Sequence, residues 1–115
     1  MTRRTPTRRG VLAGAAALAA VPGLPFAVAD TPQTHEVEIR SFAFHPAVIR
    51  ARVGDRIRWT NTDLAPHTAT ADDLGWDTGT LARNDAGDIL VTEGMETTYF
   101  CVFHPHMKGR IDIVR

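Results

Sequence analysis

The chain has 115 residues, a single cysteine, thirteen basic and thirteen acidic residues, and a formal net charge of zero at pH 7. This length excludes a large multidomain enzyme and allows one small domain with a limited core. One cysteine excludes an internal disulfide.

Residues 1–29 have the features of an export signal. Arg8 and Arg9 precede an alanine-rich apolar stretch, and Ala27–Ala29 forms a small-residue cleavage site. The apolar run Val11–Val21 is shorter than the roughly 20 residues that a membrane span needs. The sequence predicts a cleaved leader, and paired arginines after a threonine resemble a twin-arginine signal. An ordinary Sec signal and an uncleaved amphipathic tail are the alternatives.

Cleavage after Ala29 leaves residues 30–115 as one exported domain. Four arginines are lost with the leader, so nine basic and thirteen acidic residues remain, and nine minus thirteen gives a formal charge of −4. This mild acidity argues against nucleic acid as a partner. We expect a monomeric, periplasmic or otherwise exported protein with no membrane span after cleavage.

The segments predicted after the leader are all strands. They alternate polar and apolar side chains or are rich in β-branched residues, and turn signals separate them. In chain order they are residues 35–44, 48–53, 56–60, 67–71, 89–92, 97–103 and 111–114. Residues 61–66 are predicted to form a loop, and residues 72–88 a long irregular loop. No segment shows a helical period, so we expect a small antiparallel Greek-key β-sandwich.

The only cysteine lies close to two other metal-binding side chains. Cys101, His104 and Met107 follow one another at intervals of three residues, and His67 can add a second imidazole. One thiolate, two imidazoles and a thioether are the ligand set of a blue-copper electron-transfer site. Taken singly, each residue could have a purely structural role, as a core histidine, an inert buried cysteine or a packing methionine. Their spacing favours one metal site over these alternatives.

From Phe44 to its C-terminus the sequence resembles the cupredoxins of the plastocyanin/azurin family. The matching segments are F-H-P-A-V-I-R-A-R-V-G-D-R-I-R-W-T-N-T-D-L-A-P-H-T, W-D-T-G-T-L and Y-F-C-V-F-H-P-H-M-K-G-R-I-D-I-V. The C-x-x-H-x-x-M spacing is the short form found in the amicyanin branch of the family. The run N-x-[acidic]-x-x-P-H is also similar to that branch.

The resemblance implies one type 1 copper ion. His67, Cys101 and His104 would be its strong ligands and Met107 its weak axial ligand. Asn61 would brace the two ligand-bearing loops, with an ordinary turn-former as the alternative. His104 would be the port for electrons, inside a docking patch. The other residues of that patch would be Leu64, Pro66, Phe103, Pro105 and His106.

The resemblance further implies an electron carrier rather than an enzyme. Its partner would be a c-type cytochrome or a periplasmic dehydrogenase or reductase. Phe103 and the pair Pro105-His106 depart from the amicyanin sequence, so amicyanin's own dehydrogenase partner is not carried over. A copper-handling protein without a redox circuit is the alternative. A relic of a multicopper oxidase or nitrite reductase is disfavoured, because the one His-x-His spacing already contains His104.

Overall fold

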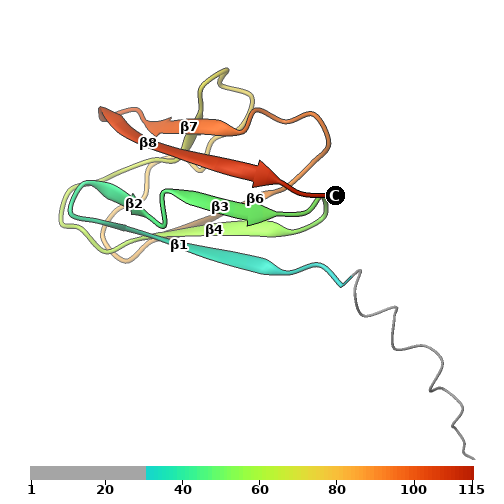
Figure 1. Cartoon of the computed structure of the whole chain (residues 1–115). Helices are drawn as coiled ribbons and strands as arrows, with labels where there is room; N and C mark the ends of the chain where they lie inside the picture. The colour runs from blue at the N-terminus through green and yellow to red at the C-terminus, as the bar shows by residue number, and fades with distance from the viewer. Residues whose placement is uncertain (1–30) are drawn as a thin grey trace, which may run out of the picture. The chain divides into compact units, whose positions relative to one another are not determined.

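The computed structural model describes residues 31–115, so the predicted leader, residues 1–29, lies outside the described residues. Two four-stranded sheets have the strand orders β2-β1-β4-β6 and β3-β8-β7-β5 (Figure 1). The strands are β1 (Thr34–Arg40), β2 (Ala43–His45), β3 (Val48–Ala51), β4 (Arg56–Asn61), β5 (Thr70–Ala71), β6 (Ala86–Leu90), β7 (Thr98–Cys101) and β8 (His104–Ile113). No helix long and apolar enough to cross a bilayer occurs in this part of the chain.

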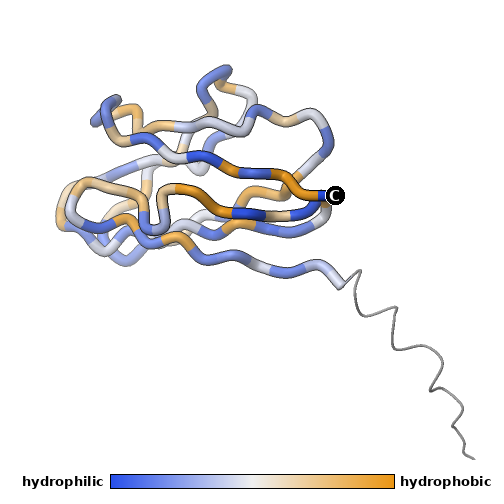
Figure 2. Tube along the Cα trace, in the orientation of Figure 1, coloured by the Kyte–Doolittle hydropathy of each residue, from blue (hydrophilic) through white to orange (hydrophobic). Residues whose placement is uncertain are grey.

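Alternate side chains of both sheets meet in one core. Figure 2 shows hydrophobic and hydrophilic positions interleaved along the strands, as expected when one face of a sheet is buried. The buried cluster includes Val37, Ile39, Ile57, Trp59, Tyr99, Cys101, Met107 and Ile111. Cys101 and Met107 thus belong to the same core that holds the two sheets together.

The all-β sandwich predicted from the sequence is confirmed, with a correction to the strand directions. Each sheet is mixed, because β1 pairs with β4 in parallel and β3 pairs with β8 in parallel. After β2 the chain crosses to the other sheet for β3 and then returns for β4. This crossover lets β4 run in the same direction as β1 without a helix between them.

The prediction of one unbroken strand over residues 35–44 is wrong. The chain reverses at Ser41 and Phe42, whose φ angles are 54° and 58°, and β2 returns antiparallel to β1 with Arg40 opposite Ala43. A two-residue hairpin turn of this kind normally contains asparagine or glycine, because both residues need a positive φ. Neither residue type is present, so the sequence carries no turn signal here.

Two further boundaries differ from the prediction. Strand β6 covers residues 86–90, whereas the sequence predicted a strand over 89–92 after a loop over 72–88. The predicted strand over residues 67–71 is reduced to Thr70 and Ala71. His35 was expected to be solvated, yet its Nε2 lies 2.8 Å from a carboxylate oxygen of Asp55.

Candidate metal centre

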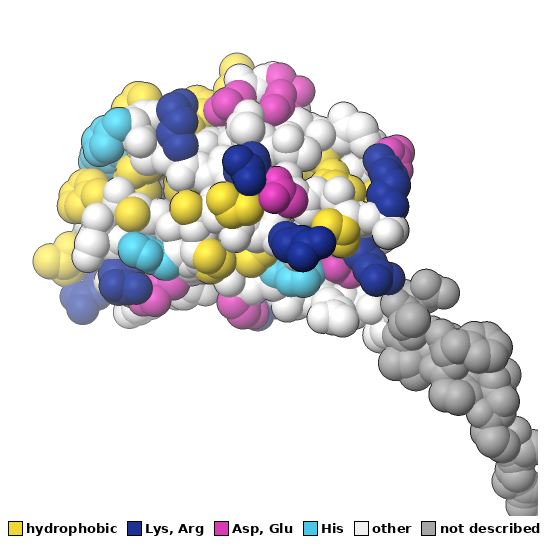
Figure 3. Space-filling model, in the orientation of Figure 1, with side chains coloured by type: hydrophobic (Ala, Val, Ile, Leu, Met, Phe, Trp, Pro, Cys, Tyr) yellow, Lys and Arg dark blue, Asp and Glu magenta, His cyan; other side chains and the backbone are white. Residues whose placement is uncertain are grey.

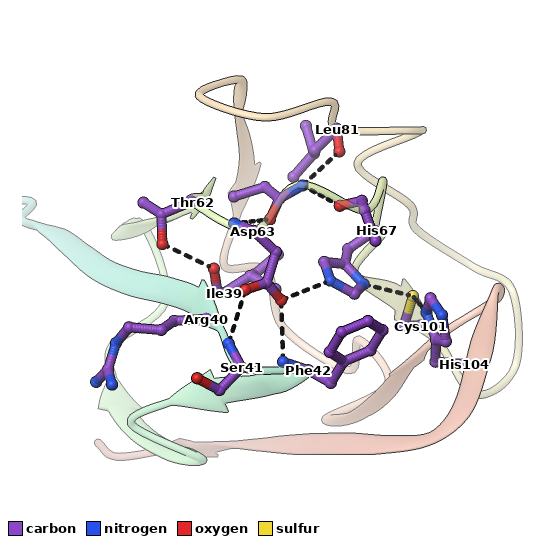
Figure 4. A network of polar contacts seen from close by, with 12 residues as sticks. Ile39, Arg40, Ser41, Phe42, Thr62, Asp63, His67, Leu81, Cys101 and His104 are labelled. Carbon is purple, nitrogen blue, oxygen red and sulfur yellow. Dashed lines mark hydrogen bonds and ion pairs between the residues drawn. The ribbon is translucent and has the colours of Figure 1, made fainter.

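His67, Cys101 and His104 come together at one end of the sandwich. Their donor atoms all lie within 4.8 Å of one another. The Nδ1 atom of His67 is 3.6 Å from Cys101 Sγ, and the Nδ1 atom of His104 is 3.8 Å from it (Figure 4). His67 and Cys101 are fully buried, and His104 is half-buried. Three soft or borderline donors therefore converge at one point, which is closed to solvent on the side of His67.

These distances fit one shared metal ion. Bonds from one metal ion are about 2.3 Å to sulfur and about 2.0–2.1 Å to nitrogen, taking the values for zinc. When two such bonds lie roughly 120° apart, the sulfur and nitrogen atoms are separated by about 3.8 Å. The two observed sulfur–nitrogen separations, 3.6 and 3.8 Å, agree with this value. Two imidazoles and a thiolate in a trigonal arrangement suit copper at a blue-copper site.

The β7–β8 hairpin positions Cys101 and His104. Cys101 ends β7, His104 begins β8, and the two residues lie opposite each other across a two-residue turn. The neighbouring pair joins Phe100 to Lys108, so one step along β7 corresponds to four along β8. Residues 105–107 therefore bulge out of the ladder. Such bulges redirect side chains at strand ends.

Met107 is the last residue of this bulge. The sequence predicted that it would lie just before the final strand, whereas β8 already begins at His104. Its side chain is only 2% exposed and belongs to the same buried cluster as Cys101. The bulge thus turns the thioether inward, while the two residues before it, Pro105 and His106, stay exposed.

His67 is held in place by backbone pairing with a distant segment. Its amide N–H donates to Leu81 O at 3.1 Å, and the Leu81 N–H donates back to His67 O at 2.8 Å. The Asn61 side-chain amide donates to Ala65 O and to Leu81 O, at 2.9 and 2.8 Å. These bonds brace the His67 loop against the Leu81 segment, rather than against the loop of Cys101 as the resemblance implied.

Comparisons with known proteins agree with this geometry. No protein-family model matches the chain. Amicyanin-alpha of Methylorubrum extorquens strain AM1 is 29% identical over 102 residues, which cover 84% of each chain. An oxidised amicyanin with a proline-to-glycine substitution matches with a TM-score of 0.62 at 26% identity, over 76% of this chain and 86% of that chain. The purple cupredoxin of Nitrosopumilus maritimus has a TM-score of 0.63 at 21% identity and shares the fold, over 70% of this chain and 99% of that chain.

The chain has a cupredoxin fold and is similar to amicyanin in sequence. The resemblance drawn from its sequence motifs is therefore confirmed. The match covers most of both chains, and the donor residues lie together at one end of a sandwich. Sequence, fold and site therefore all resemble those of amicyanin.

In this protein Thr68 joins the two loops that carry the donor residues, a role that the sequence analysis missed. Its backbone N–H donates to Cys101 Sγ at 3.4 Å, and its Oγ1 accepts the Val102 N–H at 3.0 Å. The hydroxyl of Thr70 lies 2.8 Å from that of Thr68 and donates to Asp77 Oδ1 at 2.8 Å. Since each hydroxyl has one proton, the Thr68 hydroxyl donates to Thr70.

Asp63 was also missed by the sequence analysis. Its carboxylate accepts hydrogen bonds from the backbone N–H groups of Ser41 and Phe42, at 2.8 and 2.9 Å, and lies 2.9 Å from His67 Nε2. Burial raises the pKa of this carboxyl, but the hydrogen bonds from Phe42, Ser41 and His67 outweigh burial and hold the pKa below its ordinary value. Asp63 is therefore an anion at neutral pH.

At the protein surface the His104 ring lies next to the rings of Phe42 and His106. Figure 3 shows apolar and histidine side chains gathered at the end of the sandwich where Figure 1 places the β1–β2 turn and the start of β8. All the residues expected around His104 are exposed: Leu64, Pro66, Phe103, Pro105 and His106. Phe42, absent from that expectation, is 46% exposed and packs edge-on against both imidazoles, with ring centroids 5.1 Å from His67 and 4.8 Å from His104.

Proposed function

We propose that this cupredoxin is a type 1 copper electron carrier that passes single electrons between larger redox proteins. His67, Cys101 and His104 would hold the copper ion, and Met107 would add a weak thioether ligand. Bound copper supplies a one-electron couple between Cu(I) and Cu(II). The convergence of two Nδ1 atoms on one buried sulfur, at 3.6 and 3.8 Å, is the observation that carries this proposal.

The surroundings of the site suit electron transfer. Donors from three separate segments are fixed by backbone pairing and core packing, so their positions change little when the charge of the site changes. His67 and Cys101 are shielded from water, whereas His104 reaches the exposed apolar surface. A redox partner docked over Leu64, Pro66, Phe103, Pro105 and His106 would come within a few ångströms of the His104 ring, which is the port for electrons.

The proposed partners follow from this surface and from the leader. Residues 1–29 direct export, and the monomeric domain meets a c-type cytochrome or a periplasmic dehydrogenase or reductase. The amicyanin likeness supports a redox protein partner. The cupredoxin has no substrate of its own to convert.

The test of this function is the visible absorption and EPR spectrum of the protein loaded with Cu(II). An intense thiolate-to-copper band with narrow hyperfine splitting is expected. A pale complex would show that Cys101 does not bind as a thiolate and would contradict the proposal. Stopped-flow mixing with a c-type cytochrome then separates an electron carrier, which exchanges electrons rapidly, from a copper-handling protein, which exchanges them slowly.

Replacing Met107 with glutamine is expected to keep a coloured site and lower its reduction potential. An amide oxygen is a harder ligand than a thioether and so favours Cu(II) over Cu(I). Altering groups around metal sites commonly changes metal affinity about tenfold to hundredfold. A change of that size in the affinity for Cu(I) relative to Cu(II) corresponds to roughly 60–120 mV in reduction potential. Protein-film voltammetry measures the shift. An unchanged potential would show that Met107 is not axial, and Met95→Gln, on the same scaffold, is the control for a thioether lost elsewhere.

A further inference from the structure

One carboxylate connects the metal centre to the β1–β2 turn. The two oxygens of Asp63 receive three N–H groups: Ser41 N on Oδ1, and Phe42 N and His67 Nε2 on Oδ2 (Figure 4). Asp63 is itself fixed, because its backbone N–H donates to Asn61 Oδ1 at 2.9 Å. The carboxylate is therefore aimed at these three donors by its own loop.

The contact with His67 determines which ring nitrogen is protonated. An ionised carboxylate only accepts hydrogen bonds, so His67 Nε2 must carry the proton. In a neutral imidazole the lone pair then lies on Nδ1, the atom that faces Cys101 Sγ. Carboxylates beside metal-binding histidines commonly fix the ring in this way and make it a stronger ligand.

The contacts with Ser41 and Phe42 hold a strained turn. Both residues have a positive φ, a backbone region that residues other than glycine adopt only at an energetic cost. Two hydrogen bonds to one charged side chain offset that cost. The turn presents Phe42 edge-on to both imidazoles, although nearly half of its side-chain surface stays in water. A strained turn that holds a large apolar side chain at the surface is typical of a functional position.

We propose that Asp63 is a positioning residue of the metal centre, which fixes the tautomer of His67 and holds Phe42 over the two imidazoles through the Ser41–Phe42 turn. This inference rests on the proposed copper function. The negative charge of Asp63 beside His67 stabilises the more positive, oxidised state of the site. Asp63 therefore lowers the reduction potential, and the Phe42 ring limits the access of water to the imidazoles.

The decisive variant is Asp63→Asn, which keeps the shape and removes the charge. Asparagine has one accepting oxygen, and its NH2 group would face at least one of the three N–H groups that the carboxylate now receives. We expect the affinity ratio of Cu(I) over Cu(II) to rise about tenfold, which is a potential increase of about 59 mV. Asp112→Asn is the control. It removes the same charge from an exposed ion pair with Arg110, eight residues along β8 from His104.

A second measurement uses the metal-free protein. ¹⁵N NMR of the wild type should show the proton of the His67 ring on Nε2, and nuclear Overhauser contacts should join Phe42 to both imidazoles. In Asp63→Asn we expect a tautomer mixture and weakened contacts, and Asp63→Glu should restore part of both. Phe42→Ala should keep the tautomer, which separates the two parts of the role.

The outcomes separate a failure of this inference from a failure of the proposed copper function. If the wild type forms no blue site, the proposed function fails, while the metal-free tautomer still decides whether Asp63 positions His67. If the wild type is blue and Asp63→Asn keeps its potential, its His67 tautomer and its Phe42 contacts, Asp63 is an ordinary turn residue and the inference is overturned.

Discussion

Replacing Cys101 with serine is expected to abolish the intense visible band of the Cu(II)-loaded protein and to weaken copper binding at least tenfold to hundredfold. The band needs a polarisable thiolate, and a serine hydroxyl stays protonated and binds soft metals poorly. His67 and His104 remain, so weak, pale copper binding should persist. Absorption and EPR spectra measure the loss of the band, and a competition titration with a chelator of known affinity measures the weakened binding.

The fold should survive this substitution. Cys101 is fully buried, but serine is close to it in size and the Thr68 N–H, now 3.4 Å from Sγ, can donate to the new hydroxyl. A buried hydroxyl that accepts one hydrogen bond but has no acceptor for its own proton costs about 1–3 kcal/mol. Urea unfolding of the metal-free serine variant should therefore show a lower midpoint but still a cooperative transition. A blue spectrum in the serine variant would contradict the role of Cys101, whereas an unfolded variant would contradict only this packing estimate.

The gathering of the donor side chains could be predicted from the sequence because most of it is local. Cys101, His104 and Met107 lie within seven residues, so one hairpin end must hold them together, and strand alternation on either side identified that end. Only the placement of His67 beside Cys101 depends on a long-range contact. The choice of His67 rested on the ligand set of a blue-copper site and on the family resemblance, and the structure brings its Nδ1 atom to within 3.6 Å of the sulfur.

The residues around these donors could not be predicted, because tertiary contacts place them. The turn at Ser41 and Phe42 has no glycine or asparagine, and it is supported by Asp63, more than twenty residues later. Alternation through Phe42 therefore looked like a continuing strand. Strand β6 was displaced for another reason. It is an edge strand of small and half-exposed residues, with little apolar alternation to mark its start.

Replacing Gly109 with alanine is expected to destabilise the whole domain by about 3 kcal/mol, at the upper end for overpacked cores. Gly109 lies directly opposite Tyr99 in the β7–β8 ladder, and a Cβ at this position would collide with the Tyr99 ring. An aromatic ring folded over a cross-strand glycine is a known way to stabilise a sheet. Urea unfolding should show a lower midpoint with an unchanged slope.

Tyr99 cannot move aside to relieve this collision. It is 1% exposed, and its ring packs edge-on against Phe44 and Trp59, with centroids 4.8 and 5.3 Å away. In a double-mutant cycle, Tyr99→Leu should therefore remove most of the cost of Gly109→Ala, and the coupling should exceed about 1 kcal/mol. Additive effects would show that the ring does not rest on Gly109. Because Tyr99 and Gly109 each lie two residues from a donor, Cys101 and Met107, this packing also sets the hairpin on which the metal centre is built.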